Sequence, residues 1–165
     1  MELYIMRHGI AFDTGAQGIA RDEDRTLTPE GKSRTCEVAR GLAACGVRPA
    51  IVGASPLARA VETAALVAEV LDRPAPEVCD FMRPGGRTAD LVAWLKVRGV
   101  EKALVVGHLP DVARMAAELM GMTDAPLVFK KAAVAALEFE ETWGLGRGQL
   151  LWLMQPGPLR RLGAE

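Results

Sequence analysis

The only two histidines of the chain each follow a short apolar run. His8 comes directly after Arg7 in "LYIMRHGIAF", residues 3–12, and His108 stands in "ALVVGHLPDV", residues 103–112. An arginine at the end of a buried strand needs an anionic partner or water. An imidazole can act as a nucleophile or as an acid–base group near neutral pH. The two stretches therefore indicate a site that handles an anionic group.

A second arginine, Arg59, lies in "SPLARAVETA", residues 55–64, where Ser55 is a good helix cap and Pro56 a good first helical residue. On the first turn Arg59 can point back toward the helix N-terminus, which itself attracts anions. Guanidinium groups match the oxygens of a phosphoryl group. Gly9 is expected to let the backbone turn sharply and approach a ligand closely.

Each of these features also has an ordinary structural explanation. An Arg-His pair after a strand can be incidental, the histidine of a His-Leu-Pro helix start can serve as a cap, and an arginine in an alanine-rich helix usually faces solvent. Each of these explanations is less convincing when the four side chains are considered together, because all four fall at one edge of the expected sheet.

The expected elements alternate between strands and helices, which predicts a parallel sheet covered on both faces. The early strands are residues 3–6, 49–55 and 103–106, and the helices are 29–44, 56–71, 89–96 and 110–121. Two more strands, 132–140 and 148–156, are joined by a turn at 141–148. The fold class is α/β, a three-layer sandwich with a mostly parallel central sheet. Ligands in such sheets bind beyond the carboxyl ends of the strands.

Length, charge and composition argue against several classes of protein. The chain has 165 residues, which suits one domain, and its formal net charge of -1 gives no support to a nucleic-acid or membrane partner. Charged residues interrupt the apolar N-terminus, and no apolar run reaches the length of a membrane span, so neither a signal peptide nor a spanning helix is predicted. Cys36, Cys45 and Cys79 form no CxxC pair and indicate reduced thiols in the cytoplasm. Neither a metal site nor a cofactor is expected.

Four segments, in order, resemble the histidine phosphatase superfamily, also called the phosphoglycerate-mutase-like family. They are "MRHG" at 6–9, "RTLTPEG" at 25–31, "SPLARAVETA" at 55–64 and "VVGHLPDV" at 105–112. The short chain is most similar to the SixA-type phosphohistidine phosphatases. The resemblance implies a phosphoglycerate mutase-like fold and a single histidine phosphatase domain, 1–165. It also implies that His8 is the nucleophile and that Arg7, Arg59 and His108 surround the phosphoryl oxygens.

The resemblance leaves the general acid open, because larger members carry it on an inserted segment that this chain lacks. The candidates are Asp22 and Asp80 first, with Glu77, Asp13 and Asp24 behind them. An imidazole leaving group could leave without a general acid, since protonation at its remote nitrogen weakens the phosphorus–nitrogen bond. An alkoxide leaving group depends more strongly on a general acid. The short connections also predict an open site that could admit a phosphohistidine carried by a protein.

The predicted function is a metal-independent phosphatase that forms a phosphohistidine intermediate and dephosphorylates phosphohistidine on a signalling protein. The partner is a phosphorylated protein, such as a histidine-containing phosphotransfer domain, or a small phosphoester. Three alternatives stay open: a broad-specificity phosphomonoesterase of the same superfamily, a mutase, and a phosphate-binding regulatory module without turnover.

Overall fold

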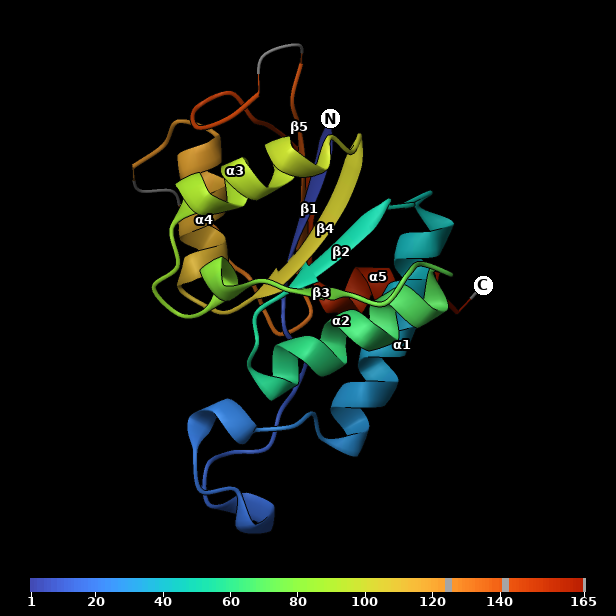
Figure 1. Ribbon diagram of the computed structural model, residues 1–165. Helices are drawn as coiled ribbons and strands as arrows, with labels where there is room; N and C mark the ends of the chain where they lie inside the picture. The colour runs from blue at the N-terminus through green and yellow to red at the C-terminus, as the bar shows by residue number, and fades with distance from the viewer. Residues whose placement is uncertain (124–125, 141–142, 165) are drawn as a thin grey trace.

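A six-stranded sheet forms the centre of the computed structural model, which describes residues 1–123, 126–140 and 143–164 (Figure 1). The strand order is β3-β2-β4-β1-β5-β6. The first four in that order run parallel, and β5 and β6 are antiparallel additions at one edge. The bounds are β1 Glu2–Arg7, β2 Ile51–Ala54, β3 Glu77–Val78, β4 Lys102–Gly107, β5 Val134–Glu138 and β6 Gln149–Met154. The predicted α/β fold with a mostly parallel sheet is confirmed.

Helices cover both faces of this sheet (Figure 1). One face carries α1 (Pro29–Ala44), α2 (Ala58–Val70) and α5 (Pro156–Leu162), and the other carries α3 (Thr88–Arg98) and α4 (Asp111–Leu119). Side chains of a strand alternate between faces. In β1, Tyr4 and Met6 accordingly belong to the first core, whereas Leu3 and Ile5 belong to the second. Burial on both faces explains why β1 and β4 are continuous apolar runs.

The first helix begins where the sequence predicts. The hydroxyl of Thr28 accepts a hydrogen bond from the Gly31 N–H at 2.9 Å, and Pro29 is the first helical residue. A cap of this kind satisfies a backbone donor that the helix leaves unpaired.

The start of α2 corrects the prediction. The helix begins at Ala58 rather than at Pro56, and Leu57 is its N-cap. Ser55 therefore lies before the helix, and its hydroxyl accepts only a long bond, 3.4 Å, from the Leu57 N–H. The reason is that Ser55 Oγ also bonds the ring of His108, which ties this residue to the neighbouring strand.

Several short elements do not follow from the sequence pattern. The connection 72–88 contains β3 and the 3-10 helix η3 (Asp80–Met82), and the loop 13–25 contains η1 (Ala16–Gly18) and η2 (Asp22–Asp24). The final helix α5 is unpredicted, because its two prolines and its glycine favour a turn. The predicted hairpin is present as β5 and β6, whereas residues 141–142 of its turn lie outside the described residues.

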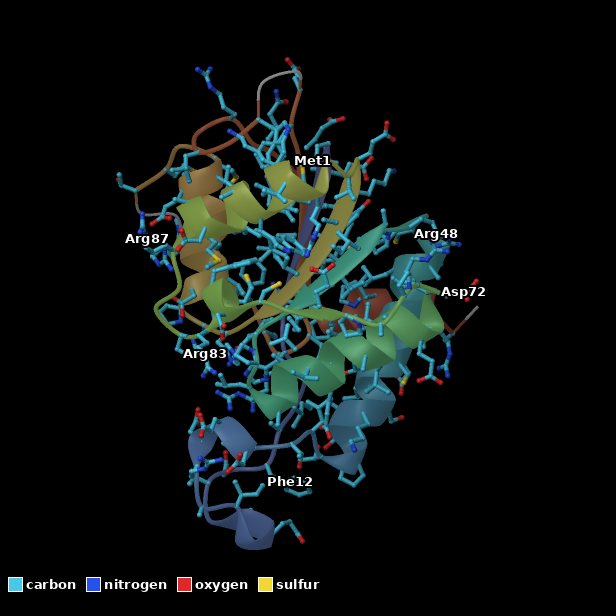
Figure 2. The ribbon with its side chains drawn as sticks, in the orientation of Figure 1. Met1, Phe12, Arg48, Asp72, Arg83 and Arg87 are labelled. Carbon is cyan, nitrogen blue, oxygen red and sulfur yellow. The ribbon has the colours of Figure 1, made fainter. Side chains whose placement is uncertain are left out.

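The strand order brings the chemically interesting ends together, since β4 lies between β1 and β2. The ladder continues past the strand ends: the His8 N–H donates to the Gly107 carbonyl, and the Ser55 N–H donates to the Val106 carbonyl, each at 3.0 Å. Figure 2 marks two nearby connections, with Phe12 on the segment after β1 and Arg83 on the segment before α3, both on the side toward which the strands run. None of the helices in the described ranges combines the length and hydropathy that crossing a bilayer requires.

Candidate active site

The ring of His8 is held by its own backbone. Nδ1 lies 2.7 Å from the carbonyl oxygen of Gly9, so Nδ1 carries the proton and donates it to that oxygen. Gly9 is fixed in turn, because its N–H donates to Thr63 Oγ1 at 3.0 Å and the Thr63 hydroxyl donates to the Arg59 carbonyl at 2.7 Å. With Nδ1 protonated, Nε2 keeps its lone pair, which is the form that a nucleophile requires.

Gly9 is needed for packing rather than for a sharp turn. Its backbone is not among those with positive φ, and a Cβ on it would come within 2.5 Å of Thr35 Oγ1. Both its N–H and its carbonyl are bonded inside the protein. Gly9 therefore orients His8, and its close backbone approach to a ligand stays a prediction.

His108 lies beside His8, with ring centroids 5.2 Å apart and ring planes at 51°. Its Nε2 is 2.8 Å from Ser55 Oγ. We assign the Ser55 hydroxyl as the donor, since this satisfies its proton while Oγ accepts from the Leu57 N–H. The remaining nitrogen, Nδ1, then carries a proton and offers a neutral donor.

Both rings are buried, and burial is the main reason why they resist protonation. It lowers the pKa of His8 to about 3 and that of His108 to about 4. The positive charges of Arg59 and Arg7 lower the pKa of both histidines further, whereas the Gly9 carbonyl opposes the shift at His8. The lowered pKa values favour the neutral form of both histidines near pH 7, and in that form His108 still offers one N–H donor.

Two arginines, Arg7 and Arg59, complete the group of candidate site residues. Arg7 Nη1 donates to the Phe129 carbonyl at 2.8 Å. Arg59, which is 5% exposed, donates from Nη1 to the Asp22 carbonyl at 2.7 Å and from Nη2 to Asp22 Oδ2 at 2.9 Å. The structure thus brings together Arg7, His8, Arg59 and His108, the four residues that the sequence placed at one sheet edge.

Three buried nitrogens of this group find no hydrogen-bond partner within the described parts of the chain: Arg7 Nε, Arg59 Nε and His108 Nδ1. An unpaired buried donor costs roughly 1 to 3 kcal/mol, and more on a charged group. Three such donors on three site residues are what an oxyanion would satisfy. The arrangement can bind a tetrahedral anion beside a neutral imidazole nucleophile.

The candidates for the general acid differ in the residues with which they pair. Asp22 contacts Arg59, and its other oxygen bonds Arg25 Nη1 at 2.9 Å. Arg25 first, and then Arg59, hold the pKa of Asp22 below its usual range, which favours the ionised form. Asp80 is mostly exposed and pairs with Arg83. Of the remaining candidates, Asp13 pairs with Arg25, Asp24 with Arg21 and Glu77 with Arg98. Asp22 is therefore the general-acid candidate that contacts a site residue, Arg59, and its lowered pKa favours the carboxylate form.

Across residues 1–123, 126–140 and 143–164, no group of three or more His, Cys, Asp or Glu side chains has the arrangement of a metal site. The functional contacts that sequence reasoning missed are those of Ser55 with His108 and of Thr63 with Gly9. Thr63 stands four residues after Arg59, on the same helix face, and that spacing was the available signal.

Comparison with known proteins agrees with this geometry. The sequence profile of the histidine phosphatase superfamily (branch 1) matches residues 3–83. A protein of Picosynechococcus sp., itself described as uncharacterized, is 38% identical over 141 residues, which cover 83% of this chain and 84% of that protein.

Solved structures carry the comparison further. The protein histidine phosphatase SixA in complex with tungstate superposes with a TM-score of 0.84 at 33% identity, over 96% of this chain and 99% of that one. A protein from Agrobacterium tumefaciens, described as a candidate phosphohistidine phosphatase SixA, has a TM-score of 0.74 at 22% identity over 93% and 96% of the two chains, and it shows the fold alone. The chain belongs to the histidine phosphatase superfamily, and this membership confirms the prediction that it is a phosphatase.

Proposed function

We propose that the chain hydrolyses phosphohistidine on a signalling protein, through a phosphohistidine intermediate at His8 and without a metal ion. The observation that carries the proposal is the pairing of a neutral His8, proton on Nδ1, with three buried unpaired N–H groups of Arg7, Arg59 and His108. The first supplies a lone pair and the others supply donors for phosphoryl oxygens.

The first step is an in-line displacement. Nε2 of His8 forms a bond to phosphorus as the bond from phosphorus to the leaving imidazole nitrogen breaks, and that nitrogen keeps the electron pair. The donors of Arg7, Arg59 and His108 stabilise the charge on the equatorial oxygens, which is where positioning and electrostatics do most of the catalysis in phosphoryl transfer. The Gly9 carbonyl holds the His8 ring in place and compensates the positive charge that the ring gains.

The second step hydrolyses the intermediate. Water attacks phosphorus, the bond to His8 Nε2 breaks, and inorganic phosphate leaves while the ring returns to its neutral form. No other residue needs to accept the phosphoryl group.

The ionised state of Asp22 supports phosphohistidine as the substrate class. A carboxylate cannot protonate a leaving group, and the ion pairs of Asp22 with Arg25 and Arg59 favour that state. An alkoxide leaving group would need a proton donor, whereas an imidazole leaving group can already be protonated at its remote nitrogen.

Similarity to SixA supports the same assignment. That protein histidine phosphatase is 33% identical and was solved with tungstate, a tetrahedral oxyanion. The partner in this proposal is a phosphorylated protein, with a histidine-containing phosphotransfer domain as the candidate. The three cysteines Cys36, Cys45 and Cys79 are free thiols, which fits the reducing cytoplasm.

The test is a substrate panel run with wild type and His8→Ala: a phosphohistidine protein, phosphoramidate, sugar phosphates, nucleotides and p-nitrophenyl phosphate. We expect the wild type to turn over the two phosphorus–nitrogen substrates fastest, with or without a strong chelator, and His8→Ala to turn over none. Equal rates on alkyl phosphates would indicate a broad phosphomonoesterase. Activity in neither protein would indicate a binding module.

A further inference from the structure

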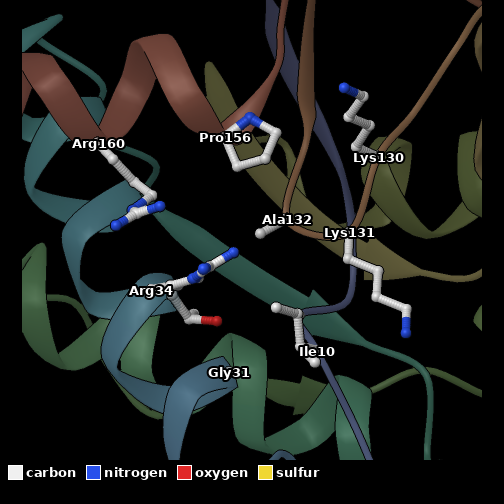
Figure 3. A pocket seen from close by; sticks show the side chains of 10 residues that line it. Ile10, Gly31, Arg34, Lys130, Lys131, Ala132, Pro156 and Arg160 are labelled. Atoms are coloured by element: carbon white, nitrogen blue, oxygen red, sulfur yellow. The ribbon is translucent and has the colours of Figure 1, made fainter.

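A cavity, called the basic cavity below, lies between α1, α5 and the segment that leads into β5 (Figure 3). Its volume is about 260 Å³. Its lining residues come from four segments: Gly9 and Ile10, then Gly31, Arg34 and Thr35, then Lys130, Lys131 and Ala132, then Pro156 and Arg160. His8, Arg59 and His108 do not line it, so the basic cavity is distinct from the phosphoryl site.

Positive charge gathers around the basic cavity. Figure 3 shows Arg34 on α1 and Arg160 on α5 extending into the space between the two helices and Ala132, with Lys131 passing Ile10 at the edge. Arg34 pairs with Glu30, and Arg160 pairs with Glu37, each at 2.5 Å. Neither Lys130 nor Lys131 forms an ion pair with any described residue. Because Lys130 extends away from the cavity in Figure 3, the uncompensated positive charge at its edge is that of Lys131.

Part of the lining of the basic cavity is apolar. Ile10, Ala132 and Pro156 supply it, and Thr35 adds a buried hydroxyl that has no hydrogen-bond partner in the described ranges. Arg34 and Arg160 each have N–H donors beyond the one that pairs with Glu30 or Glu37. Such donors beside an apolar lining match a carboxylate on a short methylene stem, because the arginines can bind the oxygens while the apolar residues cover the stem. A glutamate or aspartate side chain has this chemistry.

The basic cavity is also close to the nucleophile. Gly9 forms part of its wall, and the carbonyl of Gly9 is the group that holds the ring of His8. On a helical substrate, residues three or four positions apart lie about 5 to 6 Å from each other. Because Gly9 borders the cavity and also holds the nucleophile, we expect an acidic residue one or two turns from a phosphohistidine to reach the cavity.

We propose that the basic cavity receives an acidic side chain of the phosphoprotein substrate, one that stands within one or two helical turns of the phosphohistidine. This proposal rests on the function proposed above, and it narrows the substrate class to proteins with a carboxylate near the modified histidine.

The experiment uses two synthetic peptides of the same helical design, each with one phosphohistidine. The first carries glutamate three and four residues on either side, and the second carries glutamine at those positions. Turnover of both is measured with wild type, Arg34→Ala and Arg160→Ala. Arg40→Ala on α1 and Arg161→Ala on α5 are matched controls, since both are exposed arginines outside the cavity. Binding of the unphosphorylated peptides is measured in parallel by fluorescence anisotropy.

We expect wild type to prefer the glutamate peptide by about fivefold to tenfold in kcat/KM and in affinity, the range for a partly desolvated charge contact. Arg34→Ala and Arg160→Ala should each reduce this preference, mainly through KM, and the two controls should keep it. Equal handling of the two peptides by wild type, or a preference that survives both cavity variants, would overturn the proposal. If neither phosphopeptide is turned over, the proposed function fails, whereas the anisotropy comparison still decides whether the cavity binds a carboxylate.

Discussion

The hydroxyl of Ser55 lies 2.8 Å from Nε2 of His108, at the point where the end of β2 meets the end of β4. Ser55 is fully buried, and with its hydroxyl assigned as the donor to Nε2, the proton of His108 lies on Nδ1. Ser55 is therefore a positioning residue that leaves His108 Nδ1 as the donor to a phosphoryl oxygen.

Ser55→Ala should lower kcat because His108 loses the partner that sets its tautomer. Leaving a buried nitrogen unpaired costs about 1 to 3 kcal/mol, which corresponds to roughly a fivefold to 150-fold loss. The specific readout is the ¹⁵N chemical shift of His108, which should change from the Nδ1-protonated form to a mixture of tautomers. Full kcat together with an unchanged ¹⁵N spectrum would contradict the assignment.

Asp22→Asn should tighten inhibition by vanadate or phosphate. The Asp22 carboxylate pairs with Nη2 of Arg59 and repels a bound anion. Asparagine keeps an acceptor oxygen but removes the negative charge, so Nη2 is more available to an anion. Because Asp22 is more than half exposed, its ion pair is a weak competitor, and we expect the inhibition constant to fall by about twofold to fivefold. Asp24→Asn on the same short helix is the control, since Asp24 pairs with Arg21 instead.

The same Asp22→Asn variant tests the general-acid role. If Asp22 protonated the leaving group, the variant would lose about 100-fold or more of its turnover on an alkyl phosphate. We expect instead that the ratio of phosphoramidate turnover to alkyl phosphate turnover is the same as in the wild type.

The two histidines should stay neutral well below their ordinary pKa. Burial lowers the pKa of His8 to about 3 and that of His108 to about 4. Because the chain has no other histidine, a ¹H–¹³C spectrum contains just two imidazole Cε1–Hε1 signals to follow. Both should hold their neutral positions from pH 8 to pH 5, while the protein unfolded in urea should titrate near 6.5 as a control. An inflection near pH 6.5 in the folded protein would contradict the burial argument.

The same shifts predict how stability depends on pH. Between pH 6.5 and the lowered pKa values the unfolded chain binds more protons than the folded chain, so the free energy of unfolding falls as pH falls through 6.5. Each histidine contributes a slope of at most about 1.4 kcal/mol per pH unit. Urea unfolding at several pH values from 7.5 to 5 checks this, and His8→Ala should show a shallower slope. A flat profile in the wild type would argue against it.

The site could be predicted from sequence to the extent that it depends on strand ends. Apolar runs precede both Arg7–His8 and His108. Because the carboxyl ends of parallel strands lie at one edge of the sheet, the fold class predicts that these side chains lie close together. Arg59 followed from its place on the first turn of the helix after β2. The contact between Asp22 and Arg59 did not follow, because it depends on the path of the loop 13–25, which has no periodic pattern.

The missed elements have a similar cause. β3 is two residues long, and α5 has two prolines and a glycine in seven residues, so neither presents a periodic apolar pattern. Their placement is decided by tertiary contacts, such as the ion pair between Arg160 of α5 and Glu37 of α1. The basic cavity lies against α5 and was therefore invisible in the sequence.

The most direct test of the central claim is to trap the phosphoryl group on the enzyme. Wild type mixed with ³²P-labelled phosphoramidate and quenched within milliseconds should carry a label that is labile in acid and stable in base, and peptide mapping should place the label on His8. His8→Ala should carry none. A label that persists in His8→Ala, or turnover by the wild type with no labelled enzyme at any time, would contradict His8 as the nucleophile.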